Sequence, residues 1–506
     1  MGESKVEAEY PAEKRARKGI DNDAAAGTRR LQLNSGYLDE QFIKEFHAAF
    51  TEPNDKQTLH TIDLPNNKGR GEVVSSPFHT GRLQHILPAK FLHELKTELT
   101  ELDWHERSND LYWFHQTDDL ALNGRQHIKE LRDYLSGEEF VGFMEQITGV
   151  QLTRGYLDLA AQRYKQGNHL LCHDDDVQRG KLTRKIAYII YLVDEDWTTK
   201  DGGALGLFAT DASGYPTEVA ARIVPEFNSI GFFLTGHASF HTVEEVTVAD
   251  ADRERWSVTG WFYGPVGDAE SEPKAPPPLP SSILPELLPL VDFDAEDAVL
   301  WERWINSDYL SANVQTKIQA TFLEQSSVEL RDFLRPEVYS NFIATLTPEL
   351  WATSNQRGPA HVSKYLETPA TGDLALFLRS ASFARFLTQL TSLDYSNVSQ
   401  QIRKFEKGHY TLINDQALEP CGLDATLFLG SALETDNVPW DVSWGGATHY
   451  IADKDELLRI VPQPNSLALV LRDEGTLRFV KYLNFMAQQR SRQDISMTFI
   501  ETDASQ

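Results

Sequence analysis

With 506 residues, the chain is longer than one hydrophobic core usually fills, so two or more domains are expected. A formal net charge of -27 at pH 7 argues against binding to nucleic acid or to an anionic membrane, and no apolar run is long enough to cross a bilayer. Cys172 and Cys421 are the only cysteines, too few for a disulfide framework, which suits a reducing intracellular compartment.

Residues 1–30 are rich in charge and contain no apolar segment, so we expect a disordered leader there. Within it lies a basic cluster of the kind that directs nuclear import, and a solvated tail explains it equally well: Lys14, Arg15, Arg17 and Lys18. The predicted localisation is the nucleus and the cytoplasm.

Residues 31–263 are expected to form the first domain. Apolar residues recur at helical spacing over 90–102 and 124–149, and strand-like segments follow at 183–196 and 228–246. Proline and small residues then crowd 264–290, which we interpret as a linker.

Residues 291–506 repeat the order of the first domain. Helical spacing at 310–325 and 379–393 precedes a second group of strand-like segments. Both halves are therefore predicted to be mostly β with flanking helices.

The two halves also resemble each other in detail. Sliding RYKQGNHLLCHDDD (163–176) onto RKFEKGHYTLINDQ (403–416) aligns Gly167 with Gly408 and Asp174 with Asp415. GGALGLF (202–208) then matches GGATHYI (445–451), NSIGFFL (228–234) matches NSLALVL (465–471), and Arg255 matches Arg492. Four matches in the same order indicate an internal duplication.

The duplication singles out three polar residues of the first half. His173, Asp175 and His241 align with Asn414, Gln416 and Arg478. Two imidazoles and one carboxylate make the facial triad that holds Fe(II) with three open positions. His-x-Asp places both side chains on one face of an extended strand, and the second histidine comes from a later strand. Asn and Gln bind iron poorly and an arginine repels it, so the second half is predicted to be metal-free.

Each candidate has a plainer interpretation. A His-x-Asp pair alone more often forms a surface hydrogen bond, and the spaced histidine and arginine are what favour a metal site. His169 and His237 compete as imidazoles, but neither falls in register with the repeat, so we interpret both as ordinary polar residues.

Arg255 opens the strand-like RWSVTGWFYG, where its guanidinium can bind a carboxylate through two hydrogen bonds. Tyr191 and Tyr164 can each add a hydroxyl to the same anion. Arg253 is a rival for this role, and Arg255 can also be a surface ion-pair residue.

Tyr164, Gly167, His173, Asp175, Tyr191, GGALGLF, SFHTVEEV and RWSVTGWFYG together resemble the prolyl-hydroxylase branch of the Fe(II)- and 2-oxoglutarate-dependent oxygenases. The two-domain layout resembles the fungal and animal family of ribosomal-protein prolyl hydroxylases, which is linked to translation termination and, in yeasts, to oxygen-dependent control of a sterol-response factor.

This resemblance implies a double-stranded β-helix, the jelly-roll architecture, in each half, with the second degenerate. It implies His173, Asp175 and His241 as iron ligands, and Arg255, Tyr191 and Tyr164 as 2-oxoglutarate contacts. The implied cofactors are Fe(II), 2-oxoglutarate, dioxygen and ascorbate.

The implied activity is 3- or 3,4-hydroxylation of a proline in a small-subunit ribosomal protein near the decoding centre. Translation-termination or transcription-regulatory proteins are possible further partners. Leu207, Phe208 and Trp261 are candidates for apolar lining, although core packing explains each of them.

Two other functions stay open. Both barrels can act as a scaffold that senses 2-oxoglutarate or oxygen without turnover, or the oxygenase can act on a modified lysine, a nucleic-acid base or a small metabolite. The second half is expected to support the first domain or to dock the partner.

Overall fold

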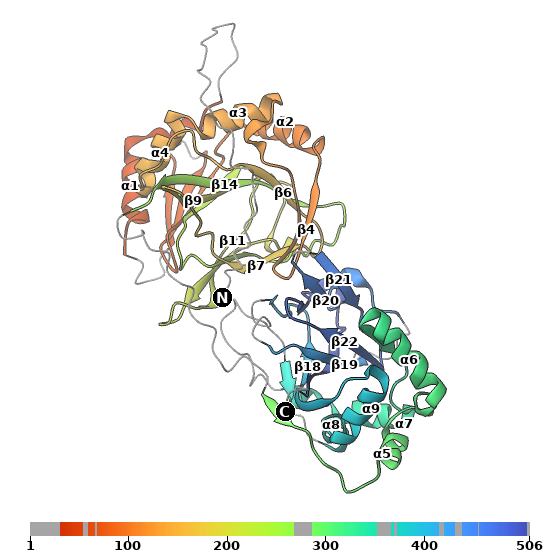
Figure 1. Ribbon diagram of the computed structural model, residues 1–506. Coiled ribbons are helices and arrows are strands. Elements are labelled where there is room, and N and C mark those ends of the chain that lie inside the picture. Colours follow the sequence, from red (N-terminus) through yellow and green to blue (C-terminus); the bar gives the residue numbers. More distant parts are fainter. Residues whose placement is uncertain are drawn as a thin grey trace.

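The computed structural model describes residues 31–53, 59–65, 68–267, 286–351, 366–368, 372–413, 419–430, 438–453 and 455–502. The charged leader, most of the predicted linker, and the repeat positions Asn414 and Gln416 lie outside these residues. Within them, the chain forms two β-rich halves, each with its own helices (Figure 1). Among these residues, no helix combines the length and apolar character that a bilayer span requires.

In the part of the first half that the structure describes, the α-helices are α1 (Glu40–Phe50), α2 (Ala89–Thr100), α3 (Gln126–Leu135) and α4 (Glu138–Thr148). Asp39 caps α1, because its carboxylate accepts the backbone N–H groups of Gln41 and Phe42. The helical pattern over 124–149 is two helices rather than one, since Gly137 breaks the run and precedes α4.

The described residues of the first half form fourteen strands: β1 (Leu59–Asp63), β2 (Arg70–Val74), β3 (Thr80–Gln84), β4 (His105–Ser108), β5 (Tyr112–Gln116), β6 (Ala160–Tyr164), β7 (His169–His173), β8 (Gln178–Arg179), β9 (Leu182–Tyr191), β10 (Leu205–Thr210), β11 (Pro216–Ile223), β12 (Ser229–Leu234), β13 (His241–Val243) and β14 (Arg255–Pro265). They pair in the order β1-β2-β3-β12-β9-β14-β6-β5-β7-β13-β10-β11, with β4 beside β5 and β8 beside β9.

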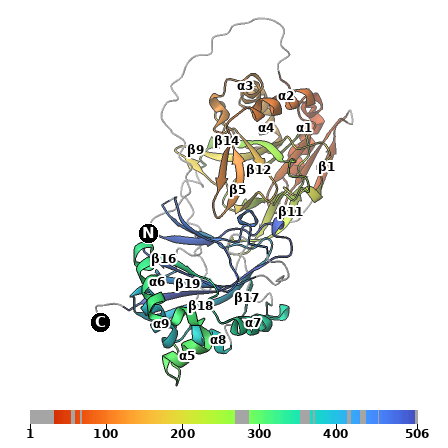
Figure 2. The same ribbon diagram turned by 90° about the vertical axis from the view of Figure 1, so that its right-hand side faces the viewer.

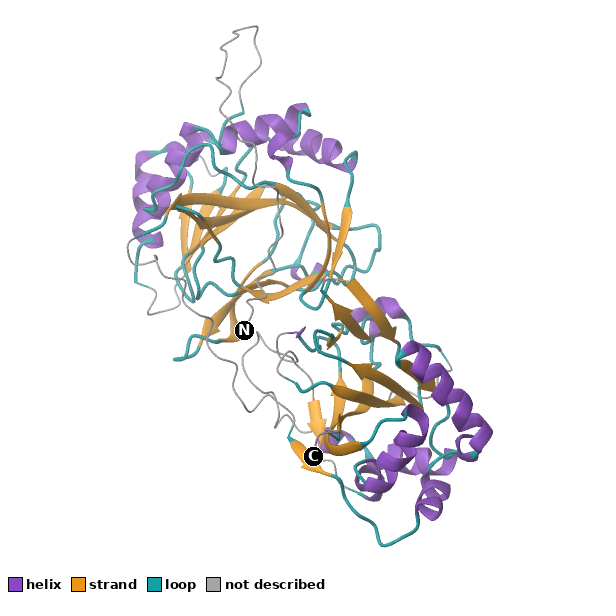
Figure 3. Ribbon diagram, in the orientation of Figure 1, coloured by secondary structure: helices purple, strands orange, loops and turns teal. Residues whose placement is uncertain are grey.

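This order folds the sheet back on itself as a double-stranded β-helix. One wall holds β12, β9, β14 and β6, and the opposite wall holds β7, β13, β10 and β11. All neighbouring strands are antiparallel, and helices cover only the first wall (Figure 3). Apolar side chains of both walls fill the space between them, including Ile189, Leu205 and Phe233.

The second half repeats this plan with fewer strands. Its helices are α5 (Asp297–Trp304), α6 (Ala312–Gln325), α7 (Pro336–Thr345), α8 (Asp373–Leu378) and α9 (Ala381–Thr391). Its strands are β15 (Leu287–Pro289), β16 (Ser327–Leu330), β17 (Leu366–Thr368), β18 (Tyr395–Phe405), β19 (Gly422–Gly430), β20 (Thr448–Ala452), β21 (Asp455–Ile460), β22 (Ser466–Arg472), β23 (Leu477–Val480) and β24 (Arg492–Glu501). β15 lies within the predicted linker segment and pairs with β18.

The larger sheet of the second half has the order β15-β18-β24-β19-β22-β16, with β17 beside β18, and the smaller sheet has the order β21-β20-β23. Tyr410–Ile413, the segment that aligns with β7, belongs to neither sheet. One backbone bond of that pairing survives, since Thr411 N–H donates to the Val480 carbonyl over 3.1 Å.

Strand register bears out the alignment of the two halves. Leu207 faces His241 across β10 and β13, and the aligned Tyr450 faces Arg478 across β20 and β23. Arg255 faces Tyr164, and the aligned Arg492 faces Phe405. The helices of the two halves lie at opposite ends of the molecule, so β-rich surfaces face each other between them (Figure 2).

Candidate metal centre

The candidate metal centre begins at an irregularity in β7. Across β7 and β13, His173 pairs with His241 and Leu170 pairs with Val243, so β7 carries one extra residue over this interval. Such a bulge changes which face of a strand the following side chains occupy. Leu170 packs against the barrel interior, Leu171 packs outward, and His173 points inward again.

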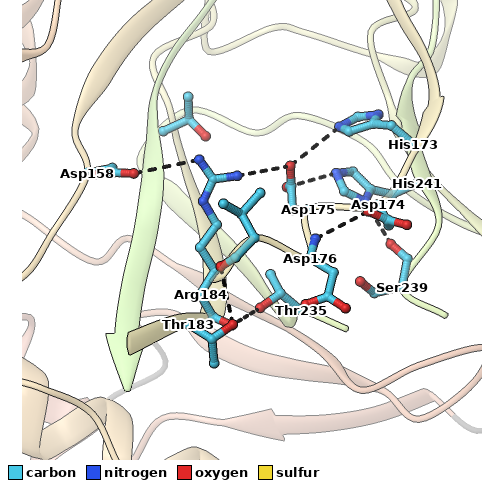
Figure 4. Close-up of polar contacts among 12 residues, drawn as sticks. Asp158, His173, Asp174, Asp175, Asp176, Thr183, Arg184, Thr235, Ser239 and His241 are labelled. Atoms are coloured by element: carbon cyan, nitrogen blue, oxygen red, sulfur yellow. Dashed lines mark hydrogen bonds and ion pairs between the residues drawn. The ribbon is translucent and has the colours of Figure 1, made fainter. Parts of the chain in front are cut away.

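Three side chains meet at this end of the barrel. One ligand atom from each of His173, Asp175 and His241 lies within 4.8 Å of the other two. The Asp175 carboxylate stands 3.8 Å from His173 Nε2 and 3.2 Å from His241 Nε2 (Figure 4). The structure thus brings together the three residues that the sequence selected, and they form its one such cluster among the described residues.

Backbone carbonyls orient both imidazoles. His173 Nδ1 lies 2.8 Å from the Leu171 carbonyl oxygen, and His241 Nδ1 lies 2.8 Å from the Ser239 carbonyl oxygen. A carbonyl only accepts, so each Nδ1 carries the proton and each Nε2 keeps its lone pair for a metal.

Burial alone would raise the pKa of the Asp175 carboxyl, but His241, His173 and Arg184 together hold it far below its usual range. Burial also opposes charge on His241, and Asp175 nevertheless raises the pKa of that imidazole. The site therefore presents an ionised carboxylate, which is the form that binds a divalent cation.

Arg255 lies deeper in the barrel and is 1% exposed. Its Nε donates to the Gly203 carbonyl over 2.7 Å, and its guanidinium carbon stands 5.1 Å from the ring centres of both Tyr164 and Tyr191. Gly203 has a φ of +68°, and a Cβ there would stand 2.6 Å from Arg255 Cδ, so this close approach needs glycine.

The buried polar groups around Arg255 suit a carboxylate ligand. Among the described residues, neither Arg255 Nη2 nor the Tyr191 hydroxyl has a hydrogen-bond partner of ordinary geometry, although both are buried. Buried polar groups are rarely left so, and a bound anion would satisfy both. Arg253, the rival, lies near the surface and pairs with Asp194, Asp196 and Asp201.

Arg184 is a site residue that the sequence patterns did not select. Its guanidinium carbon lies 3.5 Å from the Trp261 ring centre, and its nitrogens lie 3.9 Å from Asp175 and 3.7 Å from Asp158 (Figure 4). Arg184 and Trp261 come from the adjacent strands β9 and β14. The arginine of TRKIAYIIY, in a strand that ends at Tyr191, was the available signal.

The remaining sequence candidates have other surroundings. Leu207 lies in the barrel core, and Phe208 packs with Cys172 and Phe240. His237 is exposed, and His169 is buried with its ring centre 4.1 Å from that of Tyr482 in the second half.

The second barrel fills the equivalent positions with its own ion pairs. Arg478, at the place of His241, binds Asp424 at 2.9 Å and Glu419 at 2.8 Å. Arg492, at the place of Arg255, lies between the Phe405 and Phe428 rings. A buried acid, Asp494, binds Arg492 at 2.6 Å and also pairs with Arg403. Burial lowers the pKa of Arg492 to about 10 although Asp494 opposes this.

Comparison with known proteins agrees with this division. Residues 159–263 match the 2OG-Fe(II) oxygenase superfamily, and residues 296–505 match the family described as oxoglutarate and iron-dependent oxygenase degradation C-term. The first match spans the metal cluster and the residues around Arg255, from Tyr164 to Trp261.

Relatives match over nearly the whole chain. Prolyl 3-hydroxylase OGFOD1 of Xenopus laevis is 34% identical over 502 residues, covering 90% of this chain and 91% of the relative. Prolyl 3-hydroxylase OGFOD1 of Mus musculus is 30% identical, covering 79% and 83%. Prolyl 3,4-dihydroxylase OGFOD1 of Ostreococcus tauri is 28% identical, covering 85% and 96%. The chain therefore belongs to the OGFOD1 family of the 2OG-Fe(II) oxygenase superfamily, whose cofactors are Fe(II), 2-oxoglutarate and dioxygen.

Proposed function

We propose that this protein hydroxylates a prolyl residue of a small-subunit ribosomal protein, at one or two ring carbons, in a reaction that consumes 2-oxoglutarate and dioxygen. The observation that carries the proposal is the buried His173, Asp175 and His241 cluster with Arg255 deeper in the same barrel. Relatives that share most of the chain are named prolyl 3-hydroxylase or prolyl 3,4-dihydroxylase.

In this proposal the three clustered side chains hold Fe(II) through the two Nε2 atoms and a carboxylate oxygen of Asp175. When bound, iron and 2-oxoglutarate supply the oxidising chemistry that cleaves the prolyl C–H bond. The protein contributes position. Leu171 and Ser239 fix the imidazole planes through their carbonyls, and Arg255 with Tyr191 and Tyr164 anchors the distal carboxylate of the cosubstrate.

The side chains around the metal cluster favour a prolyl substrate. Trp261 offers an apolar ring beside the cluster, and Arg184 holds that ring by stacking on it. A prolyl ring is compact and apolar and packs well on an aromatic face. Arg184 also bridges Asp158 and Asp175, so it ties the substrate side of the site to a metal ligand.

The net charge of -27 supports a basic protein as substrate, which suits a ribosomal protein. Ascorbate as a reductant, regulatory partners in translation termination or transcription, and a nuclear and cytoplasmic location complete the proposal. The basic cluster that suggests nuclear import lies outside the described residues.

The test is succinate formation with a set of matched acceptors. A peptide from the ribosomal loop with its proline should stimulate succinate release and gain oxygen, whereas the same peptide with alanine at that position should do neither. A lysine peptide and free proline serve as further acceptors. Stimulation by either of these instead of the prolyl peptide would overturn the substrate assignment and leave the oxygenase chemistry standing.

A further inference from the structure

We propose that the second half positions the metal-binding and cosubstrate-binding groups of the first half, through two residues, Leu171 and Glu245. Both lie on the segments that carry the site, and both are held by the second half. This inference rests on the proposed roles of His173 and Arg255.

The two halves meet on the wall of the first barrel that bears the metal cluster. Leu171 forms one apolar cluster with Tyr410, Leu412, Leu111 and Tyr482. Lys481 Nζ donates to Ser108 Oγ over 3.0 Å and to the Tyr112 carbonyl over 3.0 Å, and Ile413 N–H donates to the Asp110 carboxylate over 3.0 Å. The contact is thus well packed and hydrogen-bonded.

The first connection runs from the second half to the metal cluster. Leu171 sits in the β7 bulge, where its side chain packs against Tyr410 and Leu412 while its carbonyl accepts from His173 Nδ1 over 2.8 Å. A bulge is an interruption of strand pairing, so its conformation depends on the contacts of its side chains. Apolar contacts from the second half therefore fix the carbonyl that aims His173.

The second connection runs to the cosubstrate anchor. The Glu245 carboxylate, 8% exposed, accepts the Phe485 backbone N–H over 2.7 Å and lies 3.4 Å from the Tyr482 hydroxyl. The Glu245 carbonyl accepts the Gly203 N–H over 3.0 Å, and the Gly203 carbonyl accepts Arg255 Nε over 2.7 Å. Three hydrogen bonds in series thus connect Phe485 with the guanidinium.

Leu171 and Glu245 each contact the residue that occupies the equivalent position in the second half. The offset of 241 that aligns Gly167 with Gly408 pairs Leu171 with Leu412, and the offset of 237 that aligns Arg255 with Arg492 pairs Glu245 with Tyr482. In a symmetric pair of subunits, a residue touches its own equivalent in the partner only where the two-fold axis passes between them. The halves are packed as such a pair, with matching walls face to face.

This arrangement gives the second half a role that does not need ligands of its own. In the second half, Arg478 occupies the position equivalent to His241. Asp494 pairs with Arg492 and so fills the space equivalent to the 2-oxoglutarate site of the first half. The wall that the second half presents to the first barrel has kept the apolar and polar groups that hold Leu171 and Glu245. These two residues are positioning residues, because neither belongs to the metal cluster or to the groups that surround Arg255.

The test measures ligand binding rather than turnover, in the full chain under anaerobic conditions. Fe(II) is titrated first, and 2-oxoglutarate is then titrated by the visible charge-transfer absorbance of its iron complex. Leu412→Ala truncates a second-half side chain that touches Leu171, and Leu390→Ala makes the same truncation in the core of the second half, within α9. Glu245→Ala removes the hydrogen-bond acceptor, and Glu245→Gln retains an amide oxygen for the Phe485 N–H.

Leu412→Ala is expected to weaken Fe(II) binding about tenfold, which corresponds to about 1.4 kcal/mol. Leu390→Ala should leave Fe(II) binding unchanged while lowering the melting temperature. Glu245→Ala should weaken 2-oxoglutarate binding by a similar factor with Fe(II) binding unchanged, and Glu245→Gln should restore it.

Two results would overturn the inference: wild-type Fe(II) affinity in Leu412→Ala, or an equal loss in Leu390→Ala, which would mean that general destabilisation is the cause. If the wild-type chain itself binds neither Fe(II) nor 2-oxoglutarate, the proposed function fails, and that outcome is separate from a failure of the positioning role.

Discussion

Arg255 and Arg492 occupy the same place in the two barrels, and each donates to the carbonyl of an equivalent glycine, Gly203 or Gly446, over 2.7 Å. Among the differences between their surroundings, one lies on the same strand as the arginine. Ser257 follows Arg255 by two residues, and Asp494 follows Arg492 by two. Among the described residues, no carboxylate pairs with the Arg255 guanidinium of the first barrel, whereas in the second barrel the Asp494 carboxylate pairs with Arg492 at 2.6 Å.

This difference predicts that Ser257→Asp blocks the cosubstrate. The new carboxylate should pair with Arg255 and weaken 2-oxoglutarate binding about a hundredfold, which corresponds to about 2.8 kcal/mol. Calorimetric titration of the Fe(II)-loaded protein with 2-oxoglutarate measures the effect. Ser257→Asn has the same shape without the charge and should bind far better than the aspartate variant. Equal binding by both variants would argue against a carboxylate site at Arg255.

The metal cluster predicts which histidines the protein needs in order to retain iron. His173→Ala or His241→Ala should lose bound iron and turnover, because the two ligands that remain in each variant do not hold the ion. His237→Ala is the matched control, since this exposed imidazole lies in the loop before β13 and outside the cluster. Metal analysis after anaerobic loading and desalting gives the result. Iron retained by His173→Ala at the wild-type level would exclude the assigned site.

The stacked pair of Arg184 and Trp261 predicts a specific effect on the substrate. Arg184→Lys keeps the charge near Asp175 but loses the planar stack on Trp261. The KM for the prolyl peptide should rise about tenfold, which corresponds to about 1.4 kcal/mol of binding free energy. The KM for 2-oxoglutarate should stay nearly unchanged. Steady-state assays with each substrate varied in turn separate the two constants. A change confined to the 2-oxoglutarate KM would place Arg184 with the cosubstrate instead.

The buried ion pairs predict which substitutions in the second half lower the stability of the protein most. Asp494 pairs with Arg403 and Arg492, and all three are at most 4% exposed. Asp494→Asn leaves two buried guanidinium groups without their carboxylate and should destabilise the protein by about 3 to 5 kcal/mol. Asp373→Asn breaks an exposed pair with Arg303 and should cost no more than about 1 kcal/mol. Chemical denaturation of both variants compares the costs, and equal costs would contradict the account of the buried pairs.

Glu245 predicts a pH dependence of the contact between the halves. Burial raises the pKa of this carboxyl from 4.5 to about 7, while the Phe485 N–H, the nearby Lys407 and the Tyr482 hydroxyl oppose the shift. Because the folded protein holds this proton more tightly than the unfolded chain, the contribution is complete below pH 4.5 and is lost as the pH rises to about 7. Melting temperatures of the wild type should therefore fall relative to those of Glu245→Gln across this range. Parallel curves for the two proteins would show that Glu245 does not titrate there.

The sequence was sufficient for the residues that chemistry constrains most. A metal triad needs His and Asp at set strand positions, and the second copy made the substitutions visible by comparison, so His173, Asp175, His241 and Arg255 could be selected without a structure. Mostly β halves with flanking helices followed from the periodicity of apolar residues, and the antiparallel double-stranded β-helix followed from the family resemblance. The helical spacing over 124–149 is confirmed by α3 and α4, but the spacing alone did not show that the segment is divided at Gly137.

Other features depend on contacts between distant segments. Arg184 becomes a site residue because β9 pairs with β14 and brings it onto Trp261. His169 looked like an ordinary polar residue, and its ring contact with Tyr482 joins positions more than three hundred residues apart in the sequence. The extra residue in β7 cannot be read from HLLCHDD, since the pattern of strand pairing defines a bulge. The contact between the halves required both folds to be known.

The most direct test of the central claim is turnover under isotopically heavy dioxygen with the prolyl peptide, analysed by mass spectrometry of the peptide and of succinate. If the first barrel is a 2-oxoglutarate-dependent prolyl hydroxylase, each turnover should place one heavy oxygen atom in the prolyl ring and one in succinate, and His173→Ala should give neither. Label in succinate with an unmodified peptide would contradict the prolyl assignment. A modified peptide without heavy oxygen, or equal activity in His173→Ala, would contradict the claim that this metal centre performs the reaction.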